Sequence, residues 1–237
     1  MFRSLSPGAI GVQVENLADG LDLAKRHGFA GYHFSIDEAV ELGSAQTLDL
    51  AASKDMRLSA WGFAVNFRQD QAAYEADMAK LPAQAKVAAE LGVLRTATWI
   101  MPASDELTYE ENFSFHVERL KPAAAVLAEQ GIRLGLEYVG PQTSWINSKH
   151  PFAHTMEQMG ELCAAVGDNV GFLLDAWHWY TAQETVDTLR ALSVEQIVDV
   201  HVNDAPAGID VAAQVDNKRA LPGETGMIDI AGFFGVL

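Results

Sequence analysis

The 237-residue sequence has a formal net charge of −16 and no run of basic residues, which excludes a phosphate-binding surface for nucleic acid. Its single cysteine, Cys163, excludes an internal disulfide, and no apolar run reaches the ~18 residues of a membrane span. We therefore expect a soluble cytoplasmic protein with no nucleic-acid or membrane partner, and this reasoning leaves a homo-oligomer open.

Short apolar runs alternate along the chain with amphipathic segments. The runs that predict strands are 9–14, 31–36, 57–65, 94–101, 133–139, 170–177 and 197–202. Helical spacing recurs between them, and it is clearest in Phe113, Val117, Leu120, Ala124 and Leu127. A strand that alternates with a helix at this spacing predicts βαβ units around a parallel sheet.

Seven such units follow one another without a linker, and residues 227–237 read as the start of a seventh helix. This order predicts an α/β fold, a (β/α)8 TIM barrel in a single domain over 1–237, with the eighth βα unit missing from this sequence. An open doubly wound sheet is the alternative. That fold usually has a glycine-rich turn after its first strand, and VQVENLADG has no glycine where the turn needs one.

The candidate site lies at the ends of three successive predicted strands. Glu137, Asp175 and His201 stand at these ends, and catalytic groups of a barrel come from the C-terminal ends of its strands. Neighbouring strands lie roughly 4.8 Å apart, so the three side chains can converge on one ion. Two carboxylates and an imidazole suit Mn²⁺, Mg²⁺, Co²⁺ or Zn²⁺.

Four stretches resemble the xylose-isomerase-like TIM-barrel superfamily of sugar phosphate isomerases and epimerases. They are LGLEYVGPQTSWIN (134–147), LLDAWHWY (173–180), DVHVND (199–204) and DNKRALPGETGMIDI (216–230). The likeness is greatest to the 2-keto-myo-inositol isomerase branch, in which a Glu-aromatic-Val-Gly strand end is followed by Pro-Gln. It is strong from residue 131 onward and weaker before it.

The resemblance implies that Glu137, Asp175 and His201 bind one divalent metal ion. It places His178 beside the substrate oxygens and Arg219 in contact with the substrate, so both are candidate catalytic and substrate-binding residues. The alternatives are a core histidine stacked between two tryptophans and a solvated loop arginine. Trp61 and Trp99 are candidate substrate-binding aromatics, because aromatic side chains often line the apolar face of a sugar.

The chain departs from the family pattern at two positions. The family's fourth ligand is a Glu at the end of the eighth strand, which we expect beyond this sequence; Glu224 belongs to an earlier loop. Ketose epimerases have a second catalytic Glu six residues after the first ligand, where this chain has Thr143. An isomerase of the inositol type is therefore favoured over a two-carboxylate epimerase.

The resulting hypothesis is a metal-dependent isomerase or epimerase that converts a sugar or polyol through an enediolate. A catalytically inactive sugar-binding or regulatory barrel is one alternative. An endonuclease-IV-type phosphodiesterase is a less favoured one, because Arg219 stands where that pattern has a histidine. The expected partner is a small sugar or polyol, and residues 205–215 form a predicted lid-like loop.

Overall fold

The computed structural model describes residues 1–237 and divides into two compact units. The first comprises Met1–Ala97 and Ala123–Arg133, and the second comprises Thr98–Pro122 and Leu134–Leu237. The prediction of one domain over the whole chain stays a prediction. None of the helices combines the length and the apolar character that a membrane crossing requires.

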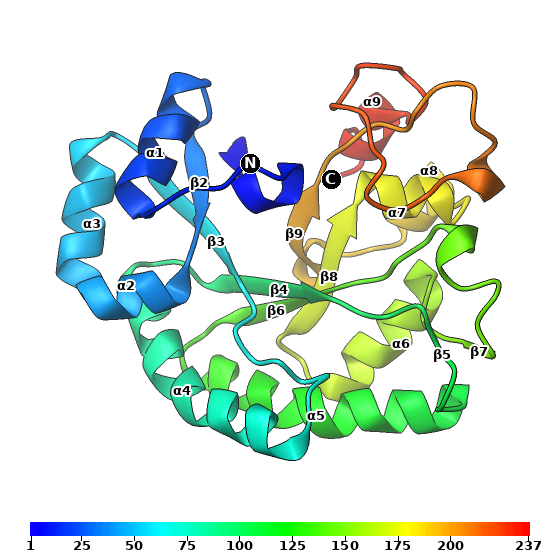
Figure 1. Cartoon of the computed structure of the whole chain (residues 1–237), viewed down its shortest axis with the longest axis horizontal. Helices are drawn as coiled ribbons and strands as arrows, with labels where there is room; N and C mark the ends of the chain where they lie inside the picture. Colours follow the sequence, from blue (N-terminus) through cyan, green and yellow to red (C-terminus); the bar gives the residue numbers. More distant parts are fainter. The chain divides into compact units, whose positions relative to one another are not determined.

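Parallel strands alternate with helices in the first unit (Figure 1). Its elements are β1 (Ser4–Leu5), the 3₁₀ helix η1 (Pro7–Ile10), α1 (Leu17–Arg26), β2 (Gly31–Phe34), α2 (Ile36–Leu42), α3 (Ser44–Ser53), β3 (Arg57–Gly62), α4 (Gln71–Glu90) and the start of β4 (Arg95–Trp99). The four strands pair in order and in parallel, with Tyr32 opposite both Leu5 and Leu58. The alternation predicted from the sequence is confirmed for this unit.

The prediction of a first strand at residues 9–14 is wrong. Residues 9–14 form no strand: the chain turns through η1, and Gly11 at φ 72° ends the turn. Ile10 and Val12 are exposed, so their apolar character does not mark a buried strand. The short β1 takes the strand's place in the sheet, because Leu5 is the buried apolar residue of this segment.

The helices of the first unit follow from local sequence. Asn16 caps α1 by accepting a hydrogen bond from the Asp19 N–H, and Leu17, Leu21 and Ala24 form its buried stripe. Helix α4 continues through Pro82, although proline removes one helical hydrogen bond.

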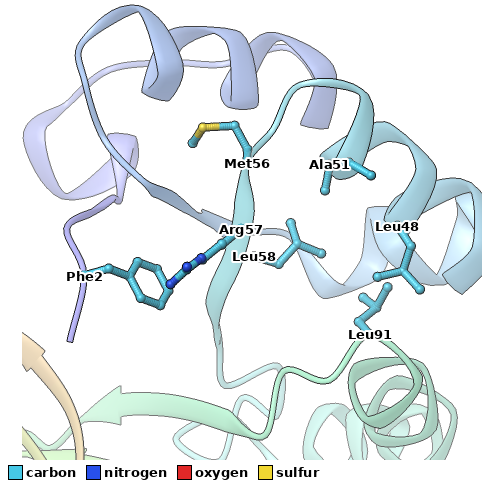
Figure 2. A pocket seen from close by; sticks show the side chains of 8 residues that line it. Phe2, Leu48, Ala51, Met56, Arg57, Leu58 and Leu91 are labelled. Atoms are coloured by element: carbon cyan, nitrogen blue, oxygen red, sulfur yellow. The ribbon is translucent and has the colours of Figure 1, made fainter.

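An apolar hollow of about 340 Å³ lies in the first unit (Figure 2). It is lined by Phe2, Leu48, Ala51, Ala52, Met56, Arg57, Leu58 and Leu91. Beside this hollow, the Arg57 guanidinium lies over the Phe2 ring, 5.0 Å from the ring centroid. No residue of the candidate site lines this hollow, so its size does not identify it as the site.

The second unit contains the remaining strands and the candidate site (Figure 1). Its elements are β5 (Ala103–Ser104), α5 (Tyr109–Glu129, ending in the first unit), β6 (Arg133–Glu137), η2 (Gln142–Ser144), β7 (His150–Pro151), α6 (Met156–Val166), β8 (Val170–Asp175), α7 (Ala176–Thr181), α8 (Val186–Arg190), η3 (Val194–Gln196), β9 (Ile197–His201), η4 (Val211–Ala213) and α9 (Ile230–Phe234). β6, β8 and β9 pair in parallel, and β5 pairs with β7 in antiparallel.

Strand β8 forms the buried centre of this parallel set. All six of its residues are buried, and Asp175 at its end lies opposite His201 of β9. Parallel register therefore brings two of the predicted strand-end residues side by side.

Gly171 of β8 gives a test of this packing. A Cβ at this position would overlap the Gln196 carbonyl oxygen and lie 3.2 Å from Val198 Cγ2. We expect Gly171→Ala to lower the free energy of unfolding by about 1–3 kcal/mol, as overpacking of a core does. Urea denaturation followed by circular dichroism measures the change. Gly8→Ala is the control, because open space surrounds Gly8; equal stability of the two variants would contradict the packing described.

Candidate functional site

The three predicted strand-end residues lie together in the second unit. His201 Nδ1 is 3.6 Å from Glu137 Oε1 and 3.9 Å from Asp175 Oδ2. Only 1% of the Asp175 side chain and 12% of the Glu137 side chain are exposed, against 37% for His201. Two nearly buried carboxylates therefore share one imidazole, which lies at the accessible side of the group.

The Asp175 carboxylate accepts four hydrogen bonds from three donor groups. Its Oδ1 accepts from the Trp177 N–H at 2.7 Å, which caps α7, and from Asn203 Nδ2 at 3.1 Å. Its Oδ2 accepts from Asn203 Nδ2 at 3.2 Å and from Arg219 Nη1 at 2.7 Å. Burial alone would raise the pKa of Asp175, but Arg219, His178 and His201 hold it below its usual value. Asp175 is therefore a fixed anion.

Arg219 links Asp175 to two further residues. Its Nη2 donates to Asp216 Oδ1 at 2.8 Å and lies 3.1 Å from His178 Nε2. The guanidinium carbon lies 5.4 Å from the centroid of the Trp177 ring. Burial alone would lower the pKa of Arg219, but Asp175 and Asp216 raise it, so the group is a permanent cation. Its Nε is buried and has no hydrogen-bond partner.

His178 is almost wholly buried and contacts the site through both ring nitrogens. The Gly140 N–H donates to Nδ1 at 3.2 Å, and Nε2 lies 4.0 Å from Glu137 Oε2. Glu137, Asp175 and His178 offer ligand atoms within 4.8 Å of one another, so His178 is a second imidazole that could complete a metal site. The sequence instead predicts His201 as the imidazole ligand and His178 as a substrate contact.

The charge on His201 follows from three acidic neighbours. Burial alone would lower its pKa, but the interactions with Glu137 and the charges of Asp175 and Asp199 raise it to about 9. The surrounding carboxylates therefore favour a positive charge at the position of the His201 ring.

The donor set fits a divalent metal ion. Glu137 and Asp175 supply two buried carboxylates, whose burial is costly without a compensating cation. Arg219 compensates the charge of Asp175, and the Glu137 carboxylate lies near the imidazoles of His178 and His201. Oxygen and imidazole donors of this kind suit Mn²⁺, Mg²⁺, Co²⁺ and Zn²⁺.

A family model described as xylose isomerase-like TIM barrel matches residues 21–237. The chain belongs to the xylose isomerase-like TIM barrel family. The family resemblance and the TIM-barrel fold expected from the sequence are thereby confirmed.

Three relatives illustrate the family match. An inosose isomerase of Bacillus velezensis is 24% identical over 231 residues, which are 94% of this chain and 79% of that protein. A xylose isomerase domain protein from Alicyclobacillus acidocaldarius has a TM-score of 0.88 at 29% identity, over 98% of this chain and 83% of that one. The IolI protein, solved with a bound zinc atom, has a TM-score of 0.73 at 21% identity, over 100% and 84% of the two chains.

Two further residues, Trp61 and Trp99, are predicted for this site from the sequence. Trp61 belongs to the first unit, where it is fully buried, and Trp99 on β4 is 44% exposed in the second unit. Their roles as substrate-binding aromatics stay predictions. Thr143, at the position of the epimerases' second Glu, donates its hydroxyl proton to the Gln214 carbonyl at 2.7 Å. It thereby anchors the predicted lid-like loop 205–215, which contains η4.

Three site residues were not singled out from the sequence: Asn203, Asp204 and Asp216. Asn203 follows His201 by two residues, a spacing that puts alternate side chains of an extended segment on one face, and this signal could have identified it. Asp216 stands three residues before Arg219, and their contact depends on a loop conformation that no periodicity encodes.

Asp204 fixes the loop that carries Arg219. Its carboxylate accepts hydrogen bonds from the backbone N–H groups of Ala205, Thr225, Gly226 and Ile228, at 2.7 to 3.0 Å. Burial alone would raise the pKa of Asp204, but these bonds lower it to about 2. The Asp204 backbone also forms a bridge with Ala220. Asn203 and Arg219, which immediately precede the two bridge residues, supply the side-chain hydrogen bonds to Asp175.

We expect Asp204→Asn to lower the free energy of unfolding by about 2 kcal/mol, because the amide leaves buried N–H donors without an acceptor. Urea denaturation measures this loss. Asp187→Asn is the matched control, because 85% of the Asp187 side chain is exposed and exposed ion pairs contribute little. A change no larger than in the control would contradict the role given to Asp204.

Proposed function

We propose that this protein is a divalent-metal-dependent isomerase or epimerase of a sugar or polyol, of the inosose isomerase type. The convergence of Glu137, Asp175 and His201, with Arg219 and His178 beside them, carries the proposal. The names of the curated relatives support the reaction class, and the zinc atom of one solved relative supports the metal.

Glu137, Asp175 and His201 would hold the metal ion, and we assign Mn²⁺, Mg²⁺, Co²⁺ or Zn²⁺ without choosing among them. A bound divalent cation supplies Lewis-acid polarisation of a carbonyl oxygen and of the neighbouring hydroxyl. Asp175 contributes a permanent negative charge, because four hydrogen bonds from three donors hold it ionised.

Arg219 and His178 would contact the substrate oxygens. The guanidinium is a hydrogen-bond donor and a cation, so it stabilises negative charge that develops on an oxygen as the carbonyl becomes an enediolate. A carboxylate or imidazole within reach then moves the proton between neighbouring carbons. The substrate class that needs this set of groups is a polyhydroxylated aldehyde or ketone.

Calorimetric titrations with Mn²⁺ and Zn²⁺ can show which side chains bind the metal ion. We expect one metal site. Its affinity should fall more than about 100-fold in Asp175→Ala and in His201→Gln, which is a larger loss than the removal of a residue that only supports a ligand causes. His178→Gln should bind within a few-fold of the unchanged protein. Loss of binding in His178→Gln, with binding retained in His201→Gln, would instead make His178 the ligand.

Isomerisation can be tested with a panel of inososes, ketoses and aldoses in deuterated water, read by NMR after the protein is loaded with metal. We expect deuterium at the carbon beside the carbonyl of a converted substrate, because the proton is exchanged through an enediolate. Arg219→Lys should lower kcat/KM about 100-fold, as loss of one donor to an oxyanion does. Saturable sugar binding with no exchange in the panel would favour an inactive sugar-binding barrel.

A further inference from the structure

Both ring nitrogens of His178 face hydrogen-bond donors. The Gly140 N–H points at Nδ1 from 3.2 Å, and Arg219 Nη2, which has no acceptor capacity, lies 3.1 Å from Nε2. A neutral imidazole carries a proton on one nitrogen and accepts only at the other. The two contacts are therefore incompatible as a pair of hydrogen bonds, and one donor must give way to the ring proton.

The Gly140 N–H is the donor that cannot move. Gly140 packs directly on the backbone of α7: a Cβ there would overlap the His178 carbonyl oxygen and lie 2.9 Å from the Ala182 nitrogen. Its own carbonyl accepts from Trp145 Nε1 at 3.2 Å, so both polar groups of the residue are engaged. Pro141 follows at φ −60° and further restricts the chain.

Arg219 is the donor that does not need the imidazole as an acceptor. Its Nη1 donates to Asp175 at 2.7 Å and its Nη2 to Asp216 at 2.8 Å, so it keeps both carboxylate partners when His178 Nε2 carries the proton. Its contact with His178 Nε2 gains no hydrogen bond once that nitrogen carries the proton. An acceptor oxygen placed between Nε2–H and the guanidinium would satisfy both donors.

We propose that the Gly140 amide fixes His178 as the Nε2–H tautomer, and that Trp145 is the positioning residue that holds Gly140 in place. His178 then presents a hydrogen-bond donor, together with Arg219, to one oxygen of the substrate. This inference rests on the proposed function for the identity of that oxygen, which is a hydroxyl or carbonyl oxygen of a polyol.

Two consequences for the chemistry follow. A metal ligand needs a free lone pair, and the lone pair of His178 lies on Nδ1, where the Gly140 N–H takes it. His178 is therefore neither the metal ligand nor the base that removes a proton from carbon. It stabilises a developing oxyanion as a neutral donor, and the choice between the two candidate imidazoles falls on His201 as the ligand.

The tautomer can be read directly in the metal-free and substrate-free protein, at a pH where the ring is neutral. Long-range ¹H–¹⁵N NMR of histidine-labelled protein, with His178 assigned from the signals lost in His178→Ala, should show a protonated Nε2 and an unprotonated Nδ1. The Gly140 amide should exchange with deuterium about three- to tenfold faster in His178→Ala, the effect of one lost hydrogen bond. An Nδ1–H tautomer, or an exchange rate that does not change, would overturn the proposal.

Trp145 has a matched control in Trp179, whose Nε1 also donates to a backbone carbonyl at 3.2 Å, that of Thr185. Trp145→Phe keeps an aromatic ring beside His154 and removes the indole N–H, together with part of the ring system, and Trp179→Phe makes the same change of side chain. We expect Trp145→Phe to speed Gly140 exchange about three- to tenfold and to lower kcat by a similar factor with KM little changed, whereas Trp179→Phe changes neither.

These two measurements separate the inference from the proposed function. Unchanged Gly140 exchange in Trp145→Phe, or equal effects of the two variants, would remove Trp145 from the proposal. Absence of isomerase activity would remove the proposed function and leave the tautomer result standing.

Discussion

The structure of the site depends on keeping one buried carboxylate ionised. Asp175 ends the most buried strand of the second unit, where an uncompensated charge is costly. Its three donors come from three places in the chain: the start of α7, the segment after β9, and the loop that carries Arg219. The need to neutralise this anion therefore determines where those three segments lie, and with them the candidate substrate contacts.

A second carboxylate, Asp204, makes that arrangement rigid. Asp204 is fully buried, and the donors to its carboxylate are backbone N–H groups, so it organises the loop conformation while Asp175 organises side chains. The bridge between Asp204 and Ala220 sets Asn203 and Arg219 at equivalent positions on two antiparallel segments. Both can then reach one acceptor without being neighbours in sequence.

The sequence could predict that the three strand-end residues lie close together, because the ends of parallel strands converge by a simple rule. Glu137, Asp175 and His201 follow from hydrophobic runs that stop at a polar residue, and the parallel register brings them together. This rule does not predict the contacts of Asp204 or Gly140, because those contacts depend on how loops fold back on the strands. It also failed at residues 9–14, where an apolar run is exposed, because hydrophobicity alone does not report burial.

The two carboxylates of the predicted metal site are not equivalent. Each Asp175 oxygen accepts two hydrogen bonds, whereas the Glu137 oxygens lie 3.6 and 4.0 Å from imidazole nitrogens. Such a difference in environment separates the roles that paired acidic groups can take. Arg219 and Asn203 hold the charge of Asp175 fixed, and a metal ion bound at this site would share the Asp175 oxygens with these two side chains. The contacts between Glu137 and the imidazoles are longer than the hydrogen bonds to Asp175, so the interactions of Glu137 can change more readily when a metal ion or a substrate arrives.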